Sequence, residues 1–172
     1  MFEGFTSHTV PVGNGIEIAA VVGGAGPPVL LLHGYPQTRA CWHKIAERLA
    51  ERFTVVAADL RGYGASSKPP GGPDHAAYAK RAMAADQVAL MRALGHPRFS
   101  LVGHDRGGRV AHRLALDHPE AVERLAVLDI CPTATMYAAT NQAFATAYYH
   151  WFFLIQPADF PERMIANNTH YF

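Results

Sequence analysis

One short segment carries the residues best suited to chemistry. Residues 103–109 read GHDRGGR, so small residues surround Asp105. This pattern is typical of a sharp turn from a strand into a helix that presents a nucleophile, with aspartate where hydrolases commonly carry serine. The central residue of such a turn must adopt a strained backbone conformation. The turn is also tight, so a Cβ atom at position 103, 107 or 108 would collide with the neighbouring strand or helix. The alternative is an ordinary strand-to-helix loop in which Asp105 caps the helix.

An aspartate in such a turn can act as a nucleophile without the help of a base. Its carboxylate is ionised at neutral pH, so it can attack a saturated carbon, displace a leaving group and form an ester. Water can then attack the carbonyl carbon of that ester, whereas an ether formed by serine could not be hydrolysed. We therefore predict Asp105 as the nucleophile. The sequence contains no Gly-x-Ser-x-Gly, which argues against a serine hydrolase.

Two earlier segments, each after an expected strand, bear on the same site. Residues 33–37 (HGYPQ) follow an apolar run, at the place where such folds supply a backbone N–H for an anion hole. Residues 59–66 (DLRGYGAS) contain Gly-x-Gly, but no helix is expected to begin there. The third glycine of the dinucleotide-binding fingerprint is also absent, so we exclude that interpretation.

Arg106 and Arg109 lie three positions apart, on the first turn of the helix expected after Asp105, and therefore share a face. Cations at a helix N-terminus oppose the macrodipole at a cost of roughly 0.3–1 kcal/mol each, so a purely structural reason for both is weak. Guanidinium groups bind carboxylates bidentately and would offset the repulsion between an anionic substrate and Asp105. The alternative is that one arginine pairs with a nearby surface acid.

The surrounding sequence predicts the elements that must position these residues. Asn14-Gly15 indicates a hairpin turn between strands at 9–12 and 16–22. Trp42, Ile45 and Leu49 are expected on one stripe of a helix. Further strands are expected at 29–32, 53–58, 99–102 and 125–130, and helices at 41–52, 78–94 and 106–117. This alternation predicts an α/β fold, a mostly parallel sheet with helices on both faces.

The character of the chain changes after Pro132. Residues 137–154 are rich in alanine and aromatic residues and are predicted to be helical, and no periodic strand pattern returns. We expect the core of the fold over residues 1–132 and the beginning of a helical cap over 133–172. The strand at 125–130 would then be an open sheet edge that carries apolar surface.

The three segments, in this order, resemble the α/β-hydrolase fold, and GHDRGGR at 103–109 resembles the haloacetate (fluoroacetate) dehalogenases in particular. The His-Asp-x-Gly core is shared with epoxide hydrolases and haloalkane dehalogenases, whereas Arg106 beside the nucleophile, with Arg109 and His150-Trp151, is more specific. Further matching segments are 36–38 (PQT), 80–83 (KRAM), 128–130 (LDI) and 149–151 (YHW). The resemblance implies hydrolysis of haloacetate to glycolate and halide through an aspartyl ester, with no metal or organic cofactor.

The resemblance also implies roles for residues that the sequence alone would assign to packing. It directs the imidazole of His150 and the indole N–H of Trp151 at the departing halide, where donors stabilise developing charge. It makes Asp129 the acid that orients a catalytic histidine, although Asp129 could instead cap the next helix. Tyr35 is expected to line the pocket, and the backbone N–H groups of Tyr35 and Arg106 to hold the oxyanion.

The catalytic histidine itself is not assigned. In this fold it follows the nucleophile and the acid late in the chain. His112 and His118 belong to the helix after Asp105, and His170 lies close to the last residue. We therefore expect the sequence to be the N-terminal portion of a longer enzyme, able at most to form the ester.

Composition narrows the partners. The 172 residues carry a formal net charge of +1, which gives no electrostatic footprint for nucleic acid, and the apolar runs are too short to span a membrane. The start of the sequence shows no secretory signal, and Cys41 and Cys131 match no metal or redox spacing, so reduced core thiols and a cytoplasmic location are expected. The resemblance implies a small haloacid as partner and is compatible with a homodimer.

Two rival functions remain open. An epoxide hydrolase uses the same aspartate but activates the ring oxygen with cap tyrosines, a role that Tyr148 and Tyr149 could fill. A non-catalytic chain of the same fold would bind small carboxylates or a partner without turnover, consistent with the unassigned histidine. Turnover of an uncharged epoxide against that of a haloacetate separates the first rival from the dehalogenase, because the arginines favour only the anion.

Overall fold

The computed structural model describes residues 1–157, 159–168 and 170. The chain divides into two compact units, residues 1–130 and 131–172. The division lies two residues before the boundary expected from the sequence. No helix among the described residues is long and apolar enough to cross a membrane.

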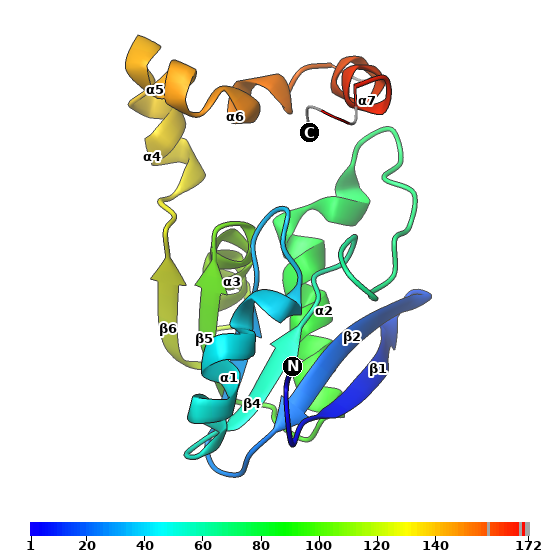
Figure 1. Ribbon diagram of the computed structural model, residues 1–172, viewed down its shortest axis with the longest axis vertical. Helices are drawn as coiled ribbons and strands as arrows, with labels where there is room; N and C mark the ends of the chain where they lie inside the picture. The colour runs from blue at the N-terminus through cyan, green and yellow to red at the C-terminus, as the bar shows by residue number, and fades with distance from the viewer. Residues whose placement is uncertain (158, 169, 171–172) are drawn as a thin grey trace. The chain divides into compact units, whose positions relative to one another are not determined.

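A six-stranded, mostly parallel sheet forms the centre of the first unit (Figure 1). Strand order across the sheet is β1-β2-β4-β3-β5-β6. β1 and β2 form the predicted hairpin, and both Asn14 and Gly15 have positive φ, as a tight hairpin turn requires. β2 is antiparallel to β4, while β3 to β6 are parallel. The strands are β1 (Thr6–Gly13), β2 (Ile16–Gly23), β3 (Pro28–Leu32), β4 (Thr54–Ala58), β5 (Phe99–His104) and β6 (Val122–Leu128).

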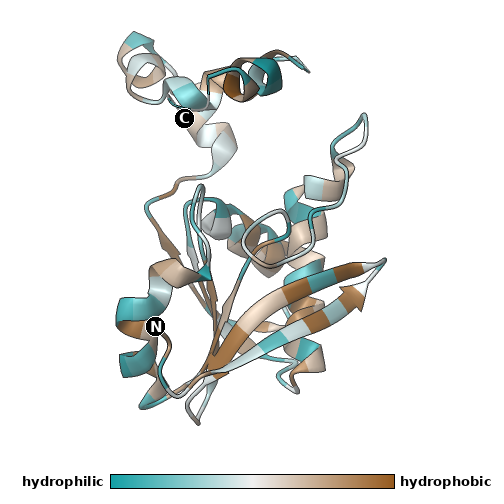
Figure 2. Ribbon diagram, turned by 45° about the vertical axis from the view of Figure 1, so that its right-hand side comes forward, coloured by the Kyte–Doolittle hydropathy of each residue, from teal (hydrophilic) through white to brown (hydrophobic). Residues whose placement is uncertain are grey.

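Helices cover both faces of this sheet, as predicted. The helical segments are η1 (Arg39–Trp42), α1 (His43–Ala50), η2 (Ala76–Tyr78), α2 (Lys80–Ala93) and α3 (Arg106–Asp117). Side chains alternate along β3, so Leu30 and Leu32 join the core beneath α2 and α3, whereas Val29 and Leu31 pack with Trp42 on the other face. Figure 2 shows the apolar character that follows the strands. The sheet is therefore a rigid frame for the loops at its edge.

The first helix departs from the prediction. Residues 39–42 form a 3-10 turn, and the α-helix begins only at His43. A 3-10 turn has about 3.0 residues per turn instead of 3.6, so it shifts the phase of the helix that follows. The buried stripe therefore runs through Trp42 and Ala46, and the expectation that Ile45 belongs to it is wrong, because Ile45 is 44% exposed.

The exposure of side chains decides two further expectations, the burial of the cysteines and the open edge of the sheet. Cys41 and Cys131 are free thiols, as predicted, but both are exposed, so their assignment to the core is wrong. β6 begins and ends earlier than predicted and lies at the edge of the described sheet. Leu125, Val127 and Leu128 are each more than 40% exposed there, which confirms an apolar open edge.

The described residues of the second unit form four short helices, α4 (Thr133–Ala138), α5 (Gln142–Ala147), α6 (Tyr149–Phe153) and α7 (Phe160–Ala166). The expectation of one helical stretch over 137–154 is only partly correct. The first helix, α4, ends at Ala138, and a new helix, α5, begins at Gln142. Asn141 caps α5 by accepting a hydrogen bond from the Phe144 N–H at 2.9 Å. Aromatic packing holds α5 to α6, because the Phe144 ring of α5 lies 5.9 Å from the ring of Phe152 and 6.1 Å from that of Trp151 on α6.

Candidate active site

The carboxyl ends of the parallel strands gather the candidate residues of the first unit. His104 at the end of β5 is in register with Leu128 at the end of β6, and Leu32 at the end of β3 is in register with Gly103. The next residues, Asp105 and Asp129, therefore leave the sheet side by side, and the Asp105 N–H donates to the Leu128 carbonyl at 3.1 Å. This edge is where α/β folds place their sites.

Asp105 occupies a strained turn between β5 and α3. Its φ is +48° and its ψ −114°, a backbone conformation that residues other than glycine rarely adopt. A Cβ at position 103 would lie 2.4 Å from the Gly107 carbonyl oxygen, one at 107 would lie 2.3 Å from that of Leu32, and one at 108 would lie 2.6 Å from Ile130 Cγ2. The predicted collisions at all three glycines are thus confirmed.

The carboxylate of Asp105 does not cap the helix that follows it. No hydrogen bond joins it to the first turn of α3, all of which lies within the described residues. Its Oδ1 instead accepts a hydrogen bond from the Tyr35 N–H at 2.8 Å. The capping interpretation is therefore wrong, and the carboxylate faces the loop that the sequence predicts as an anion-binding loop.

That loop, residues 33–37, is held by two side chains. His33 is buried, accepts the Leu60 N–H at its Nε2 (3.0 Å), and its Nδ1 lies 2.8 Å from the Gly34 carbonyl. These contacts suit a neutral ring, and burial lowers the pKa of His33. Gln37 Oε1 contacts both the Gly34 N–H (3.3 Å) and His104 Nδ1 (3.1 Å). The loop is therefore tied to the segment that follows β4 on one side and to the end of β5 on the other.

Arg106 and Arg109 stand on the first turn of α3, as predicted. The Arg106 guanidinium lies over the Tyr35 ring, with Cζ 5.4 Å from the ring centroid. No acid among the described residues lies within ion-pair distance of Arg106. The alternative in which Arg106 pairs with a surface acid is therefore wrong within the described chain, and its charge faces the same region as Asp105 and Tyr35.

Lys80, the first residue of α2, is a member of this charged group that sequence reasoning missed. Burial and the positive charges of Arg106 and Arg109 lower its pKa to about 8, against the attraction of Asp105. One signal was available in the sequence. A lysine at the start of a helix opposes the macrodipole, the same argument that singled out the two arginines.

Asp129 follows β6 with a φ of +51°, and this backbone turn ends the strand. Its side chain is 90% exposed, and its Oδ2 lies 3.9 Å from His104 Nε2. The next helix, α4, begins after Pro132, so the prediction that Asp129 caps that helix is wrong. Asp129 lies at the sheet edge close to the nucleophile candidate and free of a capping role.

Two ion pairs that involve the segment after β4 were not predicted from the sequence. Arg61 forms a buried bidentate pair with Asp86 of α2, with N–O distances of 2.6 and 2.8 Å. Asp59 is buried and pairs with Arg39, and the glycine at 64 turns tightly against its carboxylate. No helix begins in residues 59–66, so the Gly-x-Gly there is a structural turn.

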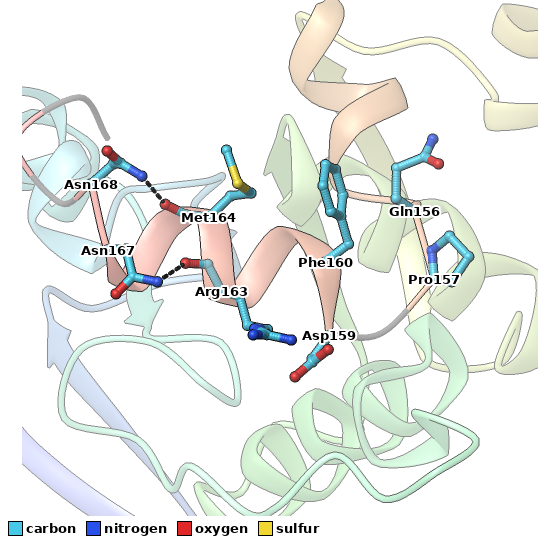
Figure 3. A pocket seen from close by; sticks show the side chains of 8 residues that line it. All are labelled: Gln156, Pro157, Asp159, Phe160, Arg163, Met164, Asn167 and Asn168. Carbon is cyan, nitrogen blue, oxygen red and sulfur yellow. Dashed lines mark hydrogen bonds between the residues drawn. The ribbon is translucent and has the colours of Figure 1, made fainter.

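His150 and Trp151 lie on α6 in the second unit. They belong to its aromatic cluster, in which the Trp151 ring is 5.8 Å from Tyr137 and His150 is 6.0 Å from Tyr148. The same unit contains a cavity of about 800 Å³ near α7 (Figure 3), where the side chains of Asn167 and Asn168 bond to the carbonyls of the helix itself. No residue predicted to act in chemistry lines this cavity.

Among the described residues, no group of three or more His, Cys, Asp or Glu side chains is arranged to hold a metal ion. The charged groups described at this edge of the sheet are instead the carboxylates of Asp105 and Asp129, the guanidinium groups of Arg106 and Arg109, and the amine of Lys80. This combination is suited to holding an organic anion beside a nucleophile.

A mostly parallel sheet entered through a hairpin, with a strained turn at Asp105 after β5 and a loop after β3 whose Tyr35 N–H meets the Asp105 carboxylate, is typical of the α/β-hydrolase class. A family model described as alpha/beta hydrolase fold matches residues 27–167, and the chain belongs to this family. It is 59% identical, over 96% of its length, to a fluoroacetate dehalogenase from a Burkholderia species, and 44% identical, over 74%, to a soluble epoxide hydrolase from Corynebacterium sp. strain C12.

Solved structures agree with this assignment. An α/β-hydrolase structure from Nostoc sp. PCC 7120 covers 99% of the chain at a TM-score of 0.95 and 59% identity, and a Pseudomonas aeruginosa structure that carries the name epoxide hydrolase reaches a TM-score of 0.92 at 49%. The chain spans 54% of the Burkholderia relative and 58% of the Nostoc chain. It therefore corresponds to about half the length of these relatives.

Proposed function

We propose that this chain carries the nucleophile half of a haloacetate dehalogenase, an enzyme that converts small 2-haloacids such as fluoroacetate or chloroacetate to the 2-hydroxyacid and halide. The observation that carries the proposal is Asp105 in a strained turn, with one carboxylate oxygen held by the Tyr35 N–H and with Arg106 and Arg109 on the adjoining helix turn. The 59% identity to a fluoroacetate dehalogenase supports the same choice.

In the first step Asp105 Oδ2 attacks the carbon that bears the halogen. An oxygen–carbon bond forms, the carbon–halogen bond breaks, and the halide departs with the bonding pair. The Tyr35 N–H holds Oδ1 at 2.8 Å, which leaves Oδ2 for attack. Arg106 and Arg109 bind the substrate carboxylate and offset its repulsion from Asp105.

In the second step water attacks the carbonyl carbon of the ester. Oδ1 is then the carbonyl oxygen and becomes the oxyanion, so the Tyr35 N–H is already in place to stabilise it, together with the N–H of Arg106. Collapse of this intermediate releases glycolate and restores the Asp105 carboxylate. We assign Asp129 to orient the histidine that activates this water.

The halide site is proposed from the resemblance. His150 and Trp151 carry N–H donors, and donors aimed at a departing halide stabilise the transition state more than the ground state. We also propose that the second unit is the beginning of the helical cap and that the protein forms a homodimer in solution, which light scattering of the purified protein measures.

An epoxide hydrolase is the second candidate, because a relative of that name is 44% identical to the chain. The stoichiometric first step distinguishes the two: halide released from chloroacetate and covalent adduct formed with an uncharged epoxide, each measured with the wild type, Arg106→Gln and Asp105→Asn. The dehalogenase predicts that Arg106→Gln slows halide release from chloroacetate and that Asp105→Asn abolishes it. Adduct formation with the epoxide alone, indifferent to Arg106→Gln, would identify an epoxide hydrolase, and no reaction with either compound would favour a non-catalytic chain.

A further inference from the structure

Tyr35 contacts two charged groups of the site, one with its backbone and one with its ring. The Tyr35 N–H donates to Asp105 Oδ1 at 2.8 Å, and the guanidinium of Arg106 lies over the Tyr35 ring, with Cζ 5.4 Å from the ring centroid. A cation within about 6 Å of the face of an aromatic ring is attracted by the quadrupole of that ring. The backbone of Tyr35 therefore meets the nucleophile candidate, and its side chain meets the cation that follows the nucleophile in sequence.

The backbone that carries this ring is held close to Asp105. Gly34 approaches the nucleophile candidate so closely that a Cβ there would lie 2.5 Å from Asp105 Cβ. The Gln37 N–H donates to the Gly34 carbonyl at 2.9 Å, and the Gly34 N–H donates to Gln37 Oε1 at 3.3 Å, so these contacts close the loop around Tyr35. The fold of the loop therefore sets where the ring stands relative to Asp105.

The ring restrains Arg106 without neutralising it. Arginine is a long, flexible side chain, and no acid among the described residues lies within ion-pair distance of this one. An acid would hold the guanidinium in place, but it would also cancel the charge and occupy the N–H donors. A neutral ring attracts the flat face of the guanidinium and leaves the donors at its edge open to a carboxylate. The contact with Tyr35 is therefore suited to orienting Arg106 for an anionic ligand.

We propose that Tyr35 is, through its ring, a positioning residue for the substrate carboxylate: the ring holds the Arg106 guanidinium in the orientation that binds the anion. This inference rests on the function proposed above and gives the side chain a role besides that of the Tyr35 N–H. One loop then positions both the nucleophile, through the hydrogen bond to Asp105, and the cation that holds the substrate. Because a substitution changes the ring and keeps the N–H, the two roles can be measured separately.

The test compares chloroacetate with 2-chloroacetamide, a neutral compound of nearly the same size. Either compound forms an ester with Asp105 as the carbon–chlorine bond breaks and chloride leaves with the bonding pair. The adduct on the full 172-residue chain is followed by intact mass at several concentrations. Only the adduct that hydroxylamine releases is counted, because an ester is cleaved and a cysteine thioether is not. The orientation of Arg106 affects the anion and not the amide, so the amide reports on the rest of the site.

The variants change the ring and keep the backbone of the loop. Tyr35→Leu removes the aromatic face and retains an apolar side chain, whereas Tyr35→Phe removes only the hydroxyl and is the matched control. Phenylalanines with one, two or three ring fluorines at position 35 lose electron density from the face with little change of shape, so they attract a cation progressively less. Arg106→Gln, alone and combined with Tyr35→Leu, completes a double-mutant cycle.

We expect Tyr35→Leu to raise the half-saturating chloroacetate concentration about three- to fivefold, with little change in the maximal rate. This is the size of a cation–π contact at a partly exposed ring, and Tyr35 is 46% exposed. Tyr35→Phe should match the wild type, and each added fluorine should raise the concentration further. All variants at position 35 should react with 2-chloroacetamide at the wild-type rate. In the Arg106→Gln background, Tyr35→Leu should have no further effect on chloroacetate.

A half-saturating concentration that does not change with fluorination, while Asp105 is still modified, refutes the role of the ring and leaves the proposed function standing. The same conclusion follows if Tyr35→Leu slows both compounds equally, or if its effect persists in Arg106→Gln, because the ring would then only shape the loop. If Asp105 of the wild type is never modified, both proposals fail. Should Tyr35→Leu not fold, the fluorinated rings carry the test.

Discussion

Alanine at position 34 tests whether the loop after β3 positions the nucleophile. The Cβ of Gly34→Ala would lie 2.5 Å from Asp105 Cβ and 2.6 Å from its Oδ1. Carbon atoms in contact keep about 3.5–4.0 Å, so the loop and the Asp105 side chain must separate by about 1 Å. Gly34 does not have a positive φ, so the substitution acts through space alone and not through backbone strain.

The separation acts on the bond between the Tyr35 N–H and Asp105 Oδ1, which is 2.8 Å long. Lengthening it by about 1 Å removes a hydrogen bond to a charged group, worth about 1.5–3 kcal/mol. A displacement of about 1 Å at a reacting group also costs about 100-fold in rate. We therefore expect Gly34→Ala to lower the rate of Asp105 modification by chloroacetate about 100-fold.

The assay is the hydroxylamine-labile adduct measured by intact mass over time, with urea unfolding as a check that the variant folds. Gly71→Ala is the control, because a Cβ there would lie 3.5 Å from His75 Nδ1, an ordinary contact, and its φ is not positive. We expect wild-type rates from this control. A folded Gly34→Ala that is modified within a few-fold of the wild-type rate would refute the idea that the close approach of this loop positions Asp105.

The remaining predictions concern stability and association. Asp86→Ala leaves the buried charge of Arg61 without its acid and should lower the free energy of unfolding by about 3–5 kcal/mol in urea; a loss under about 1 kcal/mol contradicts this. The folded-state pKa of Lys80 is about 8 against 10.5 when unfolded, so the unfolded chain binds more protons between these values and stability should rise with pH there. Lys80→Met should abolish this rise and increase the free energy of unfolding, measured in urea at pH 7, by about 1–2 kcal/mol. This gain is smaller than the ~3 kcal/mol to which the full difference between the two pKa values corresponds. If the free energy of unfolding of the variant still rises with pH as in the wild type, the prediction is wrong. Gly107→Ala places a Cβ 2.3 Å from the Leu32 carbonyl oxygen and should cost about 1–3 kcal/mol in the same measurement, so a neutral result would show that the turn relaxes. Val127→Lys puts a charge on the apolar edge of β6 and should reduce self-association in light scattering, which an unchanged molar mass at high concentration would contradict.

The parts of the fold that local patterns govern were predictable. Apolar runs bounded by turn residues located β3, β4 and β5, and Asn14-Gly15 located the hairpin. Gly103, Gly107 and Gly108 predicted the tight turn around Asp105 because the lack of a Cβ is itself the sequence signal for close backbone approach.

The features that escaped prediction depend on contacts between distant segments. The 3-10 turn before α1 moved burial from Ile45 to Ala46, a shift that the apolar spacing does not encode. The pairing of Arg61 with Asp86 joins a loop to a helix, and the proximity of Lys80 to Arg106 depends on how α2 packs against α3. Sequence spacing along one element cannot show either.

The roles of Asp105 and its neighbours are tested most directly by one covalent adduct. The protein is incubated with chloroacetate, and the intact mass is followed by peptide mapping and hydroxylamine treatment, which separates an ester at Asp105 from thioethers at the exposed Cys41 and Cys131. We predict one hydroxylamine-labile carboxymethyl group on the peptide that contains Asp105, absent from Asp105→Asn. A labile adduct that persists in Asp105→Asn, or adducts confined to the two cysteines, would show that Asp105 is not the nucleophile.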